Sequence, residues 1–185
     1  AAVVRDSCDT YIVTGAAGQG QRYVPDGSFP DGSPRYRPGN GFHGTLRRLA
    51  DGSFDFYSKD GTHYHFAEGD VSGVRLSDIE DPSGNRISYE YGLIAGQRVI
   101  TRMVDGAGRA LALDYETLAL TSEVNAGDVS VPMVNYRTLL TAVRGPGSLI
   151  VRYHYDAAGN LVKVTRGERT GGADETLDRI EEYAY

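Results

Sequence analysis

The sequence predicts an all-β protein made of consecutive antiparallel hairpins that form a curved or spiralling sheet. Three observations lead to this fold class. Apolar and polar residues alternate with the period of a strand, most clearly in residues 87–91. Pairs of Asp-Gly, or Asp and Gly three residues apart, separate such runs and favour tight turns. The 185 residues also include 24 glycines and 13 tyrosines, a composition typical of many turns and half-buried strands.

Composition and charge narrow the possible functions. The net charge of −6 argues against a nucleic-acid-binding protein, which would carry a basic stripe. Cys8 is the single cysteine, so the chain has no internal disulfide and no metal site built from cysteines. Since no apolar run approaches the roughly 18 residues of a membrane helix, we expect no membrane insertion by this segment. The chain begins without Met, and we expect it to be a fragment of a longer protein.

Residues 1–44 form the first expected segment, which contains short strands and a loop rich in Pro and Gly. Residues 10–14 are β-branched and aromatic and predict one of these strands. The glycines of residues 15–20 are compatible with a phosphate-binding loop, but the Gly-Lys-Ser/Thr ending is missing and no helical pattern follows, so a turn is favoured. Residues 29–44 contain three prolines and four glycines and predict a loop.

Residues 45–75 predict hairpins joined by Asp-Gly turns at positions 51–52 and 60–61. His63 and His65 are two residues apart, and we expect them on one face of a strand, as in a metal-binding pair.

No third metal ligand has a recognisable spacing from these two histidines, although His43 or Asp60 could approach them. We therefore expect solvated or hydrogen-bonded histidines and no metal site.

Residues 76–185 contain a repeated unit, with a hairpin inserted near residues 116–139. The stretches 76–91, 100–115 and 140–155 align without a gap, and a last copy starts at Leu161. Asp and Gly three residues apart suit a type I turn followed by a glycine with positive φ. The expected turn residues are Asp81, Gly84, Asp105, Gly108, Asp156 and Gly159. Because Asp accepts backbone N–H bonds at the start of a turn, a structural role is favoured over catalysis or calcium binding.

Alternation places one set of side chains on the expected buried face of these repeats. This repeat core consists of Ile87, Tyr89, Tyr91, Leu111, Leu113, Tyr115, Val151, Tyr153, Tyr155, Tyr183 and Tyr185. The tyrosines could stack on sugars, but they share a side with Ile, Leu and Val, so cross-strand packing is favoured.

Two local features of this segment stay open or depart from the strand pattern. Leu76 and Ile79 are three residues apart, so either a bulge lies between them or the strand is buried on both sides. Residues 173–180 lean toward a short helical turn.

The repeated unit resembles the Rhs/YD-repeat family. The motif Tyr-x-Tyr-Asp-x-x-Gly-Asn-Leu occupies residues 153–161, and the stretches 76–91 and 100–115 match well. They depart where Gly92 and Glu116 stand in place of the usual Asp, and the turn at residues 144–147 lacks its leading Asp. The resemblance covers residues 41–185 and, more loosely, the first forty residues.

The resemblance implies a sheet of hairpins wound into a spiral and closed as part of a larger hollow shell. Such shells enclose a C-terminal toxic domain in bacterial polymorphic toxins and insecticidal toxin complexes, and a related barrel belongs to the animal teneurin adhesion receptors. We therefore expect a structural fragment that encloses or presents a toxin domain, secreted or at the bacterial cell surface. The expected partners are further repeats or identical chains, joined through strand edges, and an enclosed toxin domain.

Other functional classes stay open beside this one. An adhesion or carbohydrate- or protein-binding module follows from the analogy with teneurins, and a self-assembling filament follows from open strand edges. An enzyme is the weakest expectation, because Ser7, Cys8 and Asp9 have no recognisable partner His for nucleophilic catalysis. We expect no cofactor.

Overall fold

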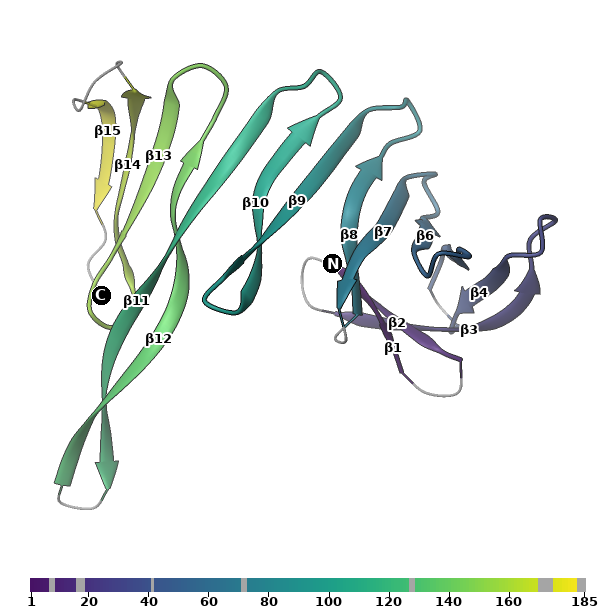
Figure 1. Ribbon diagram of the computed structural model, residues 1–185, viewed down its shortest axis with the longest axis horizontal. Helices are drawn as coiled ribbons and strands as arrows, with labels where there is room; N and C mark the ends of the chain where they lie inside the picture. The colour runs from purple at the N-terminus through teal and green to yellow at the C-terminus, as the bar shows by residue number, and fades with distance from the viewer. Residues whose placement is uncertain are drawn as a thin grey trace. The chain divides into compact units, whose positions relative to one another are not determined.

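The computed structural model describes residues 1–6, 9–15, 19–40, 42–70, 73–126, 129–169 and 175–182. Over these residues the chain is all-β, and each strand pairs with the next one along the sequence (Figure 1). The predicted fold class of consecutive antiparallel hairpins is therefore confirmed. The strands are β1 (Ala2–Arg5), β2 (Tyr11–Thr14), β3 (Gly20–Ser28), β4 (Pro34–Pro38), β5 (Thr45–Arg48), β6 (Phe54–Tyr57), β7 (His63–Asp70), β8 (Gly73–Glu80), β9 (Arg86–Ile94), β10 (Gln97–Asp105), β11 (Ala110–Ala126), β12 (Val129–Arg144), β13 (Leu149–Tyr155), β14 (Leu161–Arg169) and β15 (Glu175–Glu182).

The strands fall into two compact units, Ala1–Tyr89 and Glu90–Tyr185. The segment boundaries that the sequence predicts at positions 44/45 and 75/76 do not coincide with this division, and they stay predictions about the repeat pattern. Across the described residues, no helix has the length and apolar character needed to cross a membrane.

In the first unit, strands β1 to β8 close into a ring. Strand β1 pairs with β2 and also with β8, through Ala2 opposite Arg75 and Val3 opposite Val74. Every other neighbour in the ring is also its neighbour in sequence. The result is an eight-stranded, barrel-like sheet, a closure that the local sequence pattern does not predict.

The core of this unit lies inside the ring. It takes one buried side chain from each of the eight strands: Val3, Tyr11, Tyr23, Tyr36, Leu46, Phe54, Phe66 and Leu76. The Tyr11 ring meets those of Tyr36 and Phe54 edge to face, with centroids 5.0 and 4.8 Å apart. These rings come from β2, β4 and β6, which are not neighbours in the sheet, so their contacts cross the interior.

The expectation of a loop over residues 29–44 is wrong for its middle part. Strand β4 pairs on one side with β3 and on the other with β5, where Tyr36 lies opposite Leu46. Pro34 and Pro38 stand at its two ends, where a missing N–H does least damage to the pairing. Tyr36 is only 1% exposed, and its burial in the ring favours a strand that local propensity opposes.

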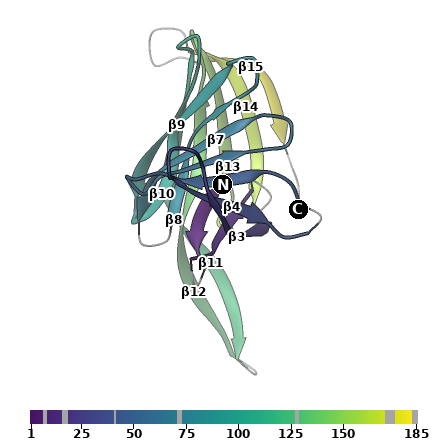
Figure 2. The same ribbon diagram turned by 90° about the vertical axis from the view of Figure 1, so that its right-hand side faces the viewer.

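In the second unit, the predicted inserted hairpin lengthens two strands of the repeat. Strands β11 and β12 pair from Ala112 opposite Arg144 to Ala126 opposite Val129, and together they make a long arm (Figures 1 and 2). Pro132 lies in regular register opposite Glu123, so it marks an edge segment and no bulge; the bulge of this pair falls between Asp114 and Tyr115.

The register of β7 and β8 shows how Leu76 and Ile79, three residues apart, both pack on the core. A shift in the β7–β8 pairing places Phe66 opposite Leu76 but His65 opposite Asp78, which leaves Ser77 as an extra residue. The bulge lets Leu76 and Ile79 both pack on the core of the ring.

The expected helical turn at residues 173–180 is wrong for residues 175–180, because strand β15 occupies Glu175–Glu182; residues 173 and 174 lie outside the described residues. Its register with β14 runs from Arg169 opposite Glu175 to Lys163 opposite Glu182. Cross-strand pairing therefore overrides a weak local helical preference.

The repeat-core side chains are less buried than the sequence predicts. Ile87 is 44% exposed, and the others within the described residues are half-buried. Tyr183 and Tyr185 lie outside the described residues. Among the described apolar side chains of the second unit, the buried ones are Leu120, Ala142 and Ile150. Alternation identifies a shared face of the sheet, but burial depends on what covers that face.

Candidate functional site

The three predicted Asp–Gly turns share one geometry. In the turn that begins at Asp156, its Oδ1 accepts the backbone N–H groups of Ala158 and Asn160 at 2.9 and 2.8 Å. Gly159 has a φ of 86° and donates its N–H to the carbonyl of Asp156 at 3.0 Å. Asp81 and Asp105 accept the corresponding bonds, and Gly84 and Gly108 also have positive φ.

The carboxylates of these turns are engaged in structural bonds. The side chain of Asn160 and then its backbone N–H hold the pKa of the Asp156 carboxyl below its usual value. Asn85 and Arg109 lower the pKa of Asp81 and Asp105 through bonds of the same kind. Each of the three turns closes a different hairpin, and among the described residues their carboxylates do not form a group with ligand atoms within 4.8 Å of one another. This arrangement fits turn formation and provides no paired acid and base.

Tyrosines at the repeat ends make a contact that recurs from one repeat to the next. The hydroxyl of Tyr115 donates to the carbonyl of Ile100, and that of Tyr155 donates to Leu140, both at 2.8 Å. Each bond joins the last residue of a repeat to its first, fifteen positions earlier. Burial raises the pKa of both tyrosines, so their hydroxyls stay protonated donors at neutral pH.

A second recurring bond links neighbouring repeats. Thr101 donates its hydroxyl to the carbonyl of Glu90, and Thr141 donates to Asp114, both at 3.3 Å. Each Thr is the second residue of its repeat, and each acceptor is the fifteenth residue of the preceding one. The equal placement shows that the aligned sequence copies are also structural copies.

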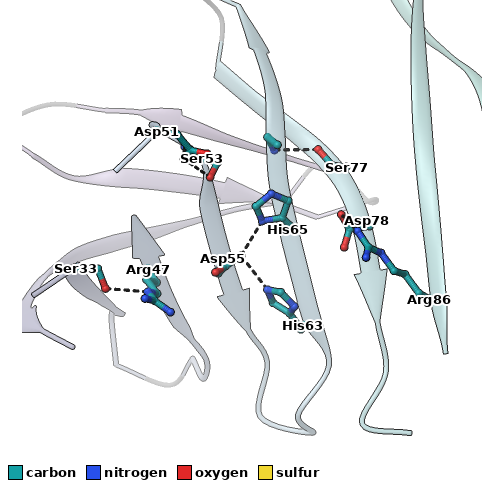
Figure 3. Close-up of polar contacts among 11 residues, drawn as sticks. Ser33, Arg47, Asp51, Ser53, Asp55, His63, His65, Ser77, Asp78 and Arg86 are labelled. Carbon is teal, nitrogen blue, oxygen red and sulfur yellow. Dashed lines mark hydrogen bonds and ion pairs between the residues drawn. The ribbon is translucent and has the colours of Figure 1, made fainter. Parts of the chain in front are cut away.

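The remaining cluster of chemically active side chains lies in the first unit, between β6 and β7 (Figure 3). Asp55 Oδ1 lies 2.9 Å from His63 Nε2 and 2.7 Å from His65 Nδ1. Asp55 is buried, whereas the side chains of His63 and His65 are 29% and 26% exposed. The expectation of hydrogen-bonded histidines agrees with these contacts, while the expected neighbours His43 and Asp60 are not in the cluster.

Sequence reasoning missed Asp55, although a signal for it was present. Its neighbours Phe54 and Phe56 point into the ring core, so alternation sends Asp55 to the opposite, outer face. The Asp-Gly turn at positions 60–61 then places it directly opposite His65. Asp55 precedes His63 by eight positions and His65 by ten, and it is the register of β6 and β7 that brings it next to both histidines.

Charged side chains on either side of the cluster are paired with other groups. Arg47, opposite Asp55 in the sheet, is directed toward Ser33, donates to its Oγ at 2.8 Å and pairs with Asp31. Asp78, opposite His65, forms an ion pair with Arg86 at 3.0 Å. Figure 3 shows these two pairs flanking Asp55 and the histidines.

Two further expected sites have structural partners. Asp9 accepts a hydrogen bond from the hydroxyl of Tyr36 at 3.3 Å, while Ser7 and Cys8 lie outside the described residues. Burial raises the pKa of Tyr36 to about 12, with smaller contributions from Tyr11 and Asp9. His154 is exposed and lies 3.4 Å from Thr165 Oγ1.

A surface cavity of about 590 Å³ lies between two loops of the first unit, lined by residues 31–34 and 47–50. Arg47 and Arg48 are the cations among its lining residues, and the Arg47 guanidinium also lies over the Phe29 ring, 5.2 Å from the centroid. Ser33 and Asp31 are both bound to Arg47, so these three residues serve the contact between the loops.

Comparisons with known proteins agree with the repeat pattern. Residues 135–170 match the family model of the RHS Repeat. This match confirms the predicted resemblance at the end of β12, at β13 and through β14. No curated protein matches the chain.

Among solved structures, the chain is similar to the N-terminal domain of effector protein SpvB from Salmonella typhimurium strain LT2. The match has 14% identity and a TM-score of 0.49, and it covers 100% of this chain and 86% of that one. A similarity of this strength supports no conclusion about function.

Proposed function

We propose that the chain is a structural segment of an Rhs-type shell that encloses or presents a toxin domain in a secreted bacterial protein. The observation that carries the proposal is the agreement between the RHS Repeat match and the hydrogen bonds of the repeats. Tyr155, within the matched residues, makes the same bond to its repeat start that Tyr115 makes one copy earlier. Stacking of equivalent hairpins is the means by which repeat proteins build extended walls.

The end of the sheet supports growth by further repeats. Among the described residues, β15 pairs with β14 alone, so its other edge has backbone N–H and C=O groups available for a next strand. The first unit differs, because its ring closes on itself through β1 and β8. We therefore place the addition of further repeats at β15.

The β11–β12 arm offers a second contact surface for this role. Met133, Val134 and Tyr136 on β12 are 44%, 51% and 71% exposed. Val134 and Tyr136 share one face of the strand, and Met133 lies on the other. Exposed apolar side chains of this kind are typical of a surface that another protein segment covers. In a shell, neighbouring repeats or enclosed cargo would cover it, and this role requires no catalysis by the segment.

Cryo-electron microscopy of the full-length gene product tests the proposal. We expect a hollow particle in which β15 pairs with a further strand and a separate chain segment lies within the wall. Limited proteolysis should cut that segment only after the wall is denatured. A particle with no internal chain, or one in which β15 stays an open edge, would contradict the proposal.

A further inference from the structure

We propose that Asp55, His63 and His65 bind a Zn²⁺ ion on the outer face of the first unit. Two imidazole nitrogens and one carboxylate oxygen are donors that zinc prefers, and three protein ligands leave its fourth position for water. The ligand atoms of the three residues lie within 4.8 Å of one another. This inference is independent of the proposed shell.

The cluster fits an ion after a rearrangement of its three side chains. Tetrahedral ligands about 2.0–2.1 Å from zinc lie about 3.3 Å from each other. Asp55 Oδ1 is now 2.9 and 2.7 Å from the two imidazole nitrogens, so the carboxylate needs to retract by about half an ångström. The two imidazole nitrogens, which lie within 4.8 Å of each other, also have to come to about 3.3 Å from each other. Zinc would bind the lone pair of each ligating nitrogen, and the proton that this nitrogen now donates to Asp55 would move to the other ring nitrogen or to solvent.

The surroundings hold the ligands in place. The His63 imidazole stacks on the Tyr57 ring, with centroids 4.7 Å apart and planes 9° from parallel. Asp55 is 7% exposed, and its sequence neighbours Phe54 and Phe56 pack on the core and hold its strand in place. Such support matters, because loss of the groups that orient metal ligands typically weakens metal affinity by about 10- to 100-fold.

The electrostatic environment also accepts a cation. Arg47 is the positively charged residue opposite Asp55, and its guanidinium is turned toward Asp31 and Ser33. Asp78, opposite His65, adds a carboxylate next to the cluster, partly balanced by Arg86. Zinc would join strands β6 and β7 and stabilise this hairpin against opening.

Isothermal titration of the chelator-treated chain with ZnCl₂ tests the site. We expect one zinc per chain, and at least about tenfold weaker binding in the double variant His63→Ala/His65→Ala. The control variants His43→Ala, His154→Ala and Cys8→Ser each remove a different potential metal ligand and leave His63 and His65 in place. Each should bind zinc as the wild type does. Equal affinity in the double variant, or a loss of binding in Cys8→Ser, would overturn the site.

A second measurement uses only the wild type and so does not depend on how the variants fold. Replacement of zinc by Co²⁺ should produce the intense visible bands of tetrahedral coordination by nitrogen and oxygen. Zinc at a hundredfold excess over Kd should also raise the unfolding temperature by roughly 5 °C. Absence of the bands together with an unchanged unfolding temperature would disprove zinc binding.

Discussion

Single glycines with positive φ shape the hairpin turns, but their surroundings differ. Gly108 and Gly159 have φ values of 80° and 86°, in a region that other residues rarely adopt. A Cβ at Gly108 would meet no atom within 4 Å, whereas one at Gly159 would lie 2.7 Å from Leu120 Cδ1. An alanine at position 108 would therefore add backbone strain alone, whereas an alanine at position 159 would add both backbone strain and a steric clash.

We predict that Gly108→Ala lowers the free energy of unfolding by about 1 kcal/mol through backbone strain. Gly159→Ala should cost about 2 kcal/mol, because the Leu120 side chain also has to move. Urea unfolding followed by circular dichroism measures both. Equal losses would show that Leu120 adapts without cost.

The turn carboxylates predict an acid-dependent loss of stability. Asp81, Asp105 and Asp156 have pKa values below the usual one in the folded chain, so their ionised forms favour folding. This stabilisation is complete above the unfolded pKa of about 4 and is lost as the pH falls through the lowered folded pKa.

We therefore expect the unfolding temperature to fall as the pH decreases below about 4. In Asp156→Asn, an amide oxygen still accepts the turn bonds but cannot be protonated in this range, so the fall should be smaller. Differential scanning calorimetry across this pH range gives the comparison. A variant that loses stability as steeply as the wild type would show that Asp156 does not contribute.

At the scale of elements, the short contact between β1 and β8 decides whether the ring closes. Gly73 begins β8 with a φ of 129°, and a Cβ there would lie 2.7 Å from the Val3 carbonyl oxygen. That atom belongs to the backbone of β1, so it cannot move without shifting the strand. A glycine at this position therefore permits the approach of the two strands.

We predict that Gly73→Ala weakens closure and costs about 2 kcal/mol or more. Hydrogen exchange should become faster for the amides of β1, while exchange in β6 stays slow. Gly52→Ala is the matched control, because Gly52 has a φ of 90° and open space around it. Unchanged protection of β1 in Gly73→Ala would contradict the role of this glycine.

At the scale of the first unit as a whole, the core depends on all eight strands. Val3 is the contribution of β1, and its side chain packs with those from the other seven strands. Without β1, one edge of β2 and one edge of residues 74–75 of β8 would be unpaired, and the ring interior would open to water.

Deletion of residues 1–6 tests this dependence. We expect the truncated chain to bind a hydrophobic dye and to associate at concentrations where the full chain does not, because edges and core are exposed. Size-exclusion chromatography with light scattering, together with dye fluorescence, measures both effects. A monomeric truncated chain with an unchanged unfolding temperature would show that β1 is dispensable.

The sequence by itself determined the fold class, the turns and most strands of the repeats. The Asp156–Gly159 turn is one case, since all of its bonds join residues within five positions of one another. Such short-range geometry depends on local side-chain chemistry and on φ preferences, which a sequence displays directly.

Only the tertiary structure decided the ring, the strand at Tyr36 and the grouping of Asp55 with His63 and His65. Strand β1 meets β8 about seventy positions later, and Tyr36 becomes part of a strand because the ring buries it. Asp55 meets the histidines through the register of two strands, and a shift of one residue would turn it to the other face. These features depend on which distant strands pair, and local alternation carries no record of that choice.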